Sequence, residues 1–158
     1  MMIFVPTSYE DARALRAGRE LAAAPGCAAT ESLIAALGPG TSAEEAEYAA
    51  LNNAGVLAIM HTAESPRLVL AAEVADDQVT DRRTELGEID VGRLSWSQVQ
   101  SLFTDESAAG EAVNTARRDA AGKDLSQALG SPAVGDLLDA YDLLWFATSE
   151  LDRLRVAD

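Results

Sequence analysis

The clearest hydrophobic pattern in the chain predicts a long helix in its first half. Residues 41–45 contain two overlapping capping boxes, which also place acidic side chains in the first turn. Apolar residues then occur on opposite sides of the helix to about Ala63, and Pro66 prevents it from continuing. A helix that is apolar on both sides is typical of a buried one. We therefore expect a central helix, in which Gly55 allows a close packing contact.

Strands are predicted by shorter patterns. In residues 67–75 both faces are largely apolar until Glu73, which favours a central strand. Weaker strand signals occur at residues 3–5, 27–30, 86–91 and 99–104, and the last of these also fits a helix. Caps and Gly or Pro terminators predict further helices after residues 7–11 and over residues 31–37 and 105–121. These elements predict an α/β or α+β fold, with residues 1–158 as a single domain around a small sheet of about four to five strands.

The last helix is predicted to be amphipathic and to run from a cap at Asp136 to about residue 154. Apolar side chains recur every three or four positions at Leu137, Ala140, Leu144, Ala147, Leu151 and Leu154. We interpret this stripe as packing on the sheet or on the buried helix of the same chain. The alternative is a helix pair across a homodimer.

One aromatic residue falls on the polar face of this predicted helix. Phe146 would lie there among Asp139, Asp142 and Glu150. Aromatic side chains are frequent anchors of protein interfaces, so these four residues are the candidate partner-binding site. The alternative is an isolated exposed ring with no role.

Charge narrows the choice of partner. The chain has 158 residues, with 26 acidic and 12 basic side chains and a formal net charge of −14. This charge opposes direct binding to nucleic acid and to anionic membranes. It favours a basic protein partner, whose approach a negative field accelerates. The sequence also lacks a signal-peptide pattern and any run of roughly 20 apolar residues that could span a membrane, so we expect a cytoplasmic protein.

Few residues offer catalytic or metal chemistry. One cysteine and one histidine cannot form an internal disulfide or a zinc site, and the common nucleotide, hydrolase and metalloprotease motifs are absent. We interpret Cys27 as a small buried residue and His61 as a structural cation at the end of the long helix. The first metal candidates are Asp76, Asp77 and Asp81, which follow the best strand. No cofactor is predicted.

The remaining basic signal is two arginine doublets. Residues 82–83 and 117–118 are Arg-Arg pairs in a strongly acidic chain. We interpret both doublets as local charge balance rather than as phosphate sites.

Several segments follow one another in an order that resembles a known family. They are IFVP at residues 3–6, EEAEYAAL at 44–51, LVLAAEV at 68–74, VQS at 99–101 and LLWFATSEL at 143–151. In this order they resemble a family of small, acidic actinobacterial proteins of unknown function. The resemblance covers most of the chain and implies a cytoplasmic protein with one α/β-type domain. It implies no activity and no catalytic residue.

Two functions follow from these observations. The first is a non-enzymatic interaction or regulatory module. The second is a small enzyme with a carboxylate-based site, with or without magnesium. An enzyme requires a concave pocket where several acids converge, whereas a binding module requires an apolar patch with acids at its rim.

Overall fold

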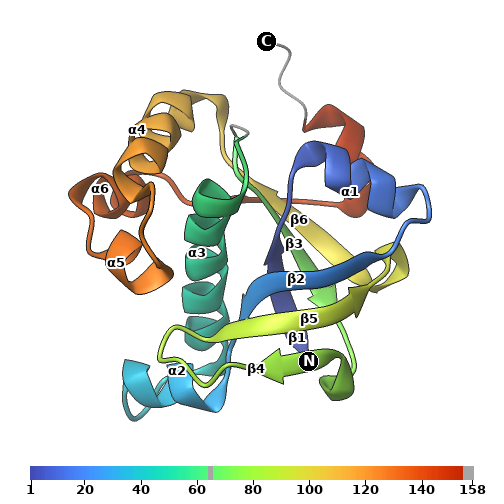
Figure 1. The fold of residues 1–158 in the computed structure, drawn as a ribbon, viewed down its shortest axis with the longest axis horizontal. Coiled ribbons are helices and arrows are strands. Elements are labelled where there is room, and N and C mark those ends of the chain that lie inside the picture. Colours follow the sequence, from blue (N-terminus) through green and yellow to red (C-terminus); the bar gives the residue numbers. More distant parts are fainter. Residues whose placement is uncertain (64–65, 155–158) are drawn as a thin grey trace.

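The centre of the fold is an antiparallel sheet. The structure is a computed structural model, and it describes residues 1–63 and 66–154. Within these residues seven strands form one sheet in the order β4-β5-β2-β1-β3-β6-β7 (Figure 1), and all neighbouring strands are antiparallel. The strands are β1 (Met2–Pro6), β2 (Leu21–Ala28), β3 (Leu68–Glu73), β4 (Val79–Asp81), β5 (Glu88–Leu94), β6 (Val99–Thr104) and β7 (Leu144–Phe146).

The predicted fold class, with its small sheet of four to five strands, is therefore wrong: the chain is α+β and its sheet has seven strands. The sequence pattern missed both edge strands entirely, and the strand predicted over residues 27–30 covers only the last two residues of β2. β4 lies in residues 76–85, a polar segment without apolar alternation, and β7 lies within the predicted last helix. Both contain three residues, too few for periodicity to reveal them.

The helices are α1 (Tyr9–Arg16), α2 (Glu31–Leu37), α3 (Ala43–His61), α4 (Gly110–Ala120), α5 (Leu125–Leu129) and α6 (Pro132–Ala140), with short 3₁₀ turns η1 (Asp76–Gln78), η2 (Trp96–Gln98), η3 (Ser107–Ala109) and η4 (Thr148–Arg153). Among the described residues, α1, α2, α3 and α5 begin at a residue whose side chain caps the helix, whereas α4 and α6 have no side-chain cap. At the start of α3 the Glu45 amide donates to Ser42 Oγ at 3.1 Å, and the Ser42 amide donates to Glu45 Oε2 at 3.1 Å. The predicted long buried helix is confirmed, because ten of the 19 residues of α3 are buried.

Both faces of the sheet are covered. Figure 1 shows α4, α5 and α6 grouped on one side of α3, and α1 on the other side of the central strands. A hydrophobic core lies on each face of the sheet. Because successive side chains of β1 point to opposite faces, Phe4 packs in the core on the α3 side, whereas Ile3 and Val5 pack in the core on the α1 side. On the α1 side, Leu15 of α1 and Leu151 of η4 complete the packing.

The predicted amphipathic helix over residues 136–154 is wrong. α6 ends at Ala140, β7 pairs with β6, and η4 follows. Leu137 and Leu151 are buried, but Leu144 is 40% exposed. Apolar residues spaced three and four apart over so short a segment also fit a helix, a strand and a 3₁₀ turn in succession. Hydrogen bonding to the open edge of β6 favours this succession over one long helix. A homodimer through a helical stripe therefore has no continuous helix to form it.

Candidate functional site

Phe146 is part of a strand rather than of a polar helix face. It lies opposite Leu102 of β6 and is half-buried against the core on the α1 side of the sheet. Part of its ring is therefore committed to packing within the chain. Its role as a partner anchor stays a prediction.

The three predicted acidic neighbours of Phe146 lie on different elements. Asp139 is exposed on α6, and Asp142 follows α6 and accepts a hydrogen bond of 2.8 Å from the Tyr48 hydroxyl. Glu150 belongs to η4, where its carboxylate accepts from the Ala147 amide at 2.8 Å. Asp142 and Glu150 thus precede and follow β7 along the chain, so acids flank the strand at both ends.

The most exposed large hydrophobic side chain on this strand is the neighbour of Phe146. Trp145 is 61% exposed, and Leu144 is 40% exposed. Trp145 lies opposite Phe103 in β6, so both rings point to the α3 side of the sheet. The sequence signal that could have identified Trp145 is the aromatic and Leu-rich run at residues 143–146, which suits a strand as well as a helix.

β7 is the last strand of the sheet, and we call its three residues, Leu144, Trp145 and Phe146, the β7 edge. In the part of the chain that the structure describes, no strand pairs with its outer side. Backbone N–H and C=O groups on such an edge are a template for pairing with another chain. The β7 edge therefore combines backbone pairing groups with an exposed indole.

Both ends of the β7 edge are held in place. Leu143, immediately before it, is 9% exposed and packs against α3, where a Cβ on Gly55 would come within 3.1 Å of Leu143 Cδ1. Leu151, after it, is fully buried in the core on the α1 side. The indole of Trp145 is thus presented from a strand that is fixed before and after it. The packing contact predicted for Gly55 is confirmed.

The three metal candidates are exposed. Asp76 and Asp77 belong to η1 and Asp81 ends β4, where its carboxylate accepts from the Arg83 amide at 2.7 Å. Among residues 1–63 and 66–154, no group of three or more His, Cys, Asp or Glu side chains is arranged to hold a metal ion. The structure therefore does not join these aspartates into a three-ligand site.

Cys27 and His61 occupy the positions that the sequence predicted. Cys27 is fully buried, and burial, with a smaller contribution from Glu88, raises the pKa of its thiol to about 12. The thiol is consequently protonated at neutral pH and is a poor nucleophile. His61 is the last residue of α3 and is exposed, at the end of the helix where a cation is favourable.

A buried ion pair escaped the sequence analysis. Arg67 and Asp105 are each 1% exposed at the side chain, and the guanidinium binds both carboxylate oxygens, from Nε at 2.9 Å and from Nη2 at 2.6 Å. The Arg67 amide adds a third bond to Asp105 Oδ2 at 3.0 Å. Arg67 immediately precedes β3 and Asp105 immediately follows β6, so the antiparallel pairing of these strands brings the two together. The sequence signal that could have predicted this ion pair is a basic residue before one apolar strand and an acidic residue after another.

This ion pair is part of the packing rather than a reactive centre. A Cβ on Gly55 would lie 3.0 Å from Arg67 Nη1, so the guanidinium lies directly against the backbone of α3. Every buried side-chain N or O atom among the described residues has a hydrogen-bond partner. We therefore assign the pair to the junction between β3, β6 and α3.

Comparison with families of proteins matches residues 1–154 to one of unknown function. The chain belongs to the DUF6912 family. The expected membership of a family of unknown function is confirmed. No curated protein and no solved structure matches the chain, so no residue of this DUF6912 member takes a role from a characterised relative. None of the helices in its described part is long and apolar enough to cross a membrane.

Proposed function

We propose that this DUF6912 chain is a non-enzymatic interaction module that binds a basic segment of a partner protein at the β7 edge. The observation that carries the proposal is the 61% exposure of Trp145 on an edge strand whose two ends are anchored. Tryptophan is enriched among the residues that contribute most to interfaces, because it buries a large area at a small entropic cost. The backbone of the edge supplies directional pairing, and the indole supplies apolar contact.

Charge supports a basic partner over a second copy of the chain. Each copy carries a formal charge of −14, so two copies repel each other as they approach. A segment rich in Lys or Arg is attracted instead, and Asp142 and Glu150 lie at either end of β7 to meet its charges.

An extended segment is the conformation that this surface fits. Strand addition to an open sheet edge gives affinity through main-chain hydrogen bonds and selectivity through alternate side chains. Because Trp145 points to the α3 side, every second residue of the added strand would face that ring. The expected ligand is therefore an extended peptide in which basic and apolar residues alternate.

The test is a binding titration of fluorescent peptides with the full chain. One peptide alternates Lys with Val, a second alternates Glu with Val, and a third has the basic composition in a helix-forming order. We expect the basic extended peptide to bind, with weaker binding at higher salt, and to shift the backbone amide resonances of residues 144–146. Equal binding of the acidic peptide, or shifts confined to another surface, would overturn the proposal.

A matched pair of variants locates the contact. Trp145→Ala should weaken binding of the basic peptide about tenfold or more. Leu37→Ala removes a side chain that is 45% exposed on α2, which is not part of the β7 edge, and should leave affinity within about twofold. Equal losses in the two variants would contradict binding at the β7 edge. Sedimentation showing a dimer that Trp145→Ala dissociates would replace the basic partner with a second copy.

A further inference from the structure

The two ends of the β7 edge carry acids that are used in different ways. Glu150, after the edge, accepts from the Ala147 amide at 2.8 Å and belongs to η4, which packs on the α1 side through Leu151. Asp142, before the edge, is exposed and is bonded to a side chain of α3. Because Trp145 points to the α3 side, Asp142 is the one of these two acids that lies on the side of the indole.

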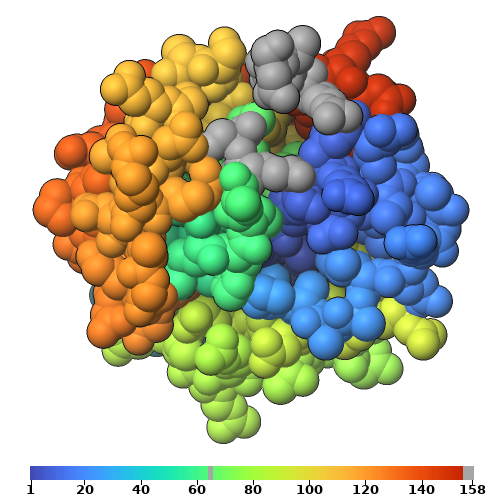
Figure 2. All heavy atoms as spheres, turned by 45° about the horizontal axis from the view of Figure 1, so that its top comes forward, coloured from blue at the N-terminus to red at the C-terminus, as the bar shows by residue number. Residues whose placement is uncertain are grey.

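The segment before β7 is held against one face of α3 at two points. The Tyr48 hydroxyl donates to Asp142 Oδ1 at 2.8 Å, and a Cβ on Gly55 would come within 3.1 Å of Leu143 Cδ1. Tyr48 and Gly55 are seven residues apart, about two helical turns, so they lie on the same face of α3. Figure 2 shows the orange atoms of the helices that precede this segment directly beside the green atoms of α3. Asp142 therefore reaches the β7 edge from a fixed position.

The contact with Tyr48 leaves the charge of Asp142 uncompensated. A hydroxyl is a neutral donor, and it donates to one of the two carboxylate oxygens. Among residues 1–63 and 66–154, Asp142 forms no ion pair with a basic side chain. Glu44 is exposed four residues before Tyr48, so it adds negative charge on the same side of α3. The Asp142 carboxylate is therefore available to a cation from outside the chain.

Aromatic side chains accompany this carboxylate. The ring of Tyr48, which is 53% exposed, is joined to it through the hydroxyl, and Trp145 follows Asp142 by three residues. Lysine and arginine side chains combine a charged end with an apolar stem, so a carboxylate accompanied by exposed rings suits both parts. We propose that Asp142, positioned by Tyr48, binds a lysine or arginine side chain of the partner segment. This subsite rests on the function proposed for the β7 edge and names the partner residue that the edge selects.

The direction of the bound segment follows from the same placement. All neighbouring strands of the described sheet are antiparallel, and antiparallel pairing is slightly more stable per residue than parallel pairing. A segment added antiparallel to β7 has its carboxyl end beside Leu144, where β7 begins, two residues after Asp142. The selected lysine or arginine is therefore near the carboxyl end of the residues that pair with β7.

The experiment is a titration of the full chain with fluorescent peptides that carry at most one charge. Three peptides share an extended Thr-Val repeat with both termini blocked: one has a single lysine at the carboxyl end of the repeat, one has it at the amino end, and one has none. We expect the peptide with the carboxyl-terminal lysine to bind at least about fivefold more tightly than the other two. Equal affinities of the two lysine peptides, or a preference for the amino-terminal lysine, would overturn the proposal.

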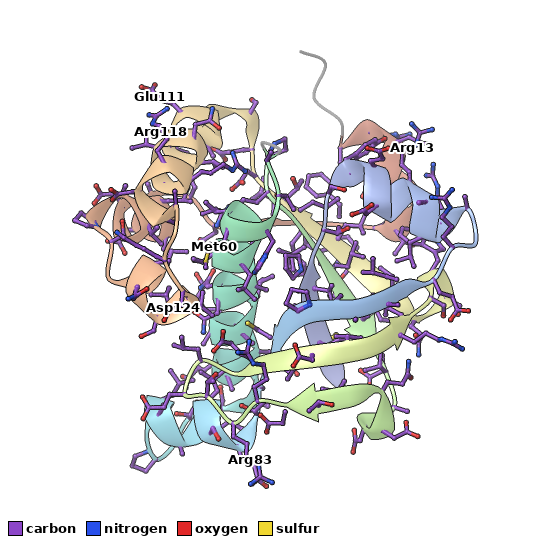
Figure 3. All side chains as sticks on the ribbon, in the orientation of Figure 1. Arg13, Met60, Arg83, Glu111, Arg118 and Asp124 are labelled. Carbon is purple, nitrogen blue, oxygen red and sulfur yellow. The ribbon has the colours of Figure 1, made fainter. Side chains whose placement is uncertain are left out.

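Two charge-matched variants separate a local contact from general attraction. Asp142→Asn should remove the preference for the carboxyl-terminal lysine, so that the three peptides bind within about twofold of one another. Glu111→Gln removes the same charge from the exposed outer surface of α4, where Figure 3 shows Glu111, and should leave the preference unchanged within about twofold. A preference that survives Asp142→Asn would reject the subsite. Thermal unfolding checks that each variant is folded.

Tyr48→Phe tests the positioning role, because it keeps the ring but removes the hydroxyl that holds Asp142. We expect the peptide with the carboxyl-terminal lysine to bind about threefold or more weakly, whereas the peptide without lysine keeps its affinity. Tyr48→Phe should cause no further loss when it is added to Asp142→Asn. A contact that only ties the segment to α3 would instead weaken all three peptides alike, and that result would reject the positioning role.

Failure of the subsite can be told apart from failure of the function on which it rests. Trp145→Ala should weaken all three peptides, because each of them contacts the exposed indole. If Trp145→Ala has this effect while Asp142→Asn leaves the lysine preference intact, the subsite is rejected and the β7 edge remains the binding surface. If none of the three peptides binds, both proposals are rejected.

Discussion

The two edges of the sheet are built alike but present different chemistry. β4 and β7 are both three-residue strands, and each pairs with a single antiparallel neighbour. The sequence of β4 is Val-Thr-Asp, with acids before it and Arg82–Arg83 after it, whereas that of β7 is Leu-Trp-Phe. Length and pairing therefore do not explain why one edge is polar and the other aromatic.

The surroundings of β4 show how an edge is protected. The Gln78 side chain donates to the Arg93 carbonyl at 2.9 Å and accepts from Gln98 Nε2 at 2.9 Å, which ties the segment before β4 to the sheet. Charged side chains and short strands are the usual means by which proteins prevent pairing at an edge. The β7 edge is equally short but exposes Trp145 instead of charge, and the binding proposed for this edge rests on that difference.

The largest expected effect is on the rate of cysteine alkylation in β2, one of the strands that lie between the two edge strands. Cys27 lies in β2, and burial raises the pKa of its thiol from 9.0 to about 12. The thiolate population near pH 8 then falls by a factor on the order of 1000, so alkylation of the native protein should be that much slower than alkylation of the unfolded chain. Trp145→Ala and Thr80→Ala, one at each edge, should both leave labelling slow. Rapid labelling in either variant would mean that an edge controls opening of the whole sheet.

The next largest effect compares how strongly the two edge strands are anchored to the core. Leu151→Ala should lower the free energy of unfolding by about 2–5 kcal/mol, because it leaves a cavity beneath β6 and η4. Val79→Ala, at the half-buried start of β4, should lower it by less than about 1.5 kcal/mol. Denaturant unfolding measures both. Equal losses would show that the β7 edge is no better anchored than β4.

The smallest effect lies on the β7 edge itself. Because Leu144 is 40% exposed, Leu144→Ala should lower the free energy of unfolding by less than about 1 kcal/mol. The predicted helix placed Leu137 on the same apolar stripe as Leu144, but Leu137 is fully buried in α6. Leu137→Ala should therefore lower the free energy of unfolding by about 2–5 kcal/mol. The same denaturant measurement compares them, and a large loss from Leu144→Ala would restore the interpretation of this segment as core.

Local signals predicted much of the fold. α2 occupies residues 31–37 and β6 occupies residues 99–104, as their caps and apolar patterns predicted. The edge strands were missed because three residues carry no periodicity and depend on a neighbour for their hydrogen bonds. The ion pair of Arg67 and Asp105 depends on strand order, which the sequence alone does not supply.

In the candidate site, the exposed aromatic residue differs by one position from the predicted one. A helical reading exposed Phe146 and a strand reading exposes Trp145, because successive residues of a strand point to opposite faces. The sequence analysis expected an exposed aromatic side chain in this region, but the ring that faces solvent is Trp145 rather than Phe146. A partner site formed by Phe146 with Asp139, Asp142 and Glu150 stays a prediction. Only the pairing of β7 with β6 decides between the two readings.

The pairing of Arg67 with Asp105 has a consequence for the descent of the family. Loss of either partner alone leaves an uncompensated charge in the interior, at a cost of about 3–5 kcal/mol, whereas replacement of both by apolar residues of similar volume is tolerated far better. Lineages should therefore keep the two positions together or change them together, with few intermediates between. Gly55 should follow the same history, since a bulkier residue there becomes acceptable only once the guanidinium is gone.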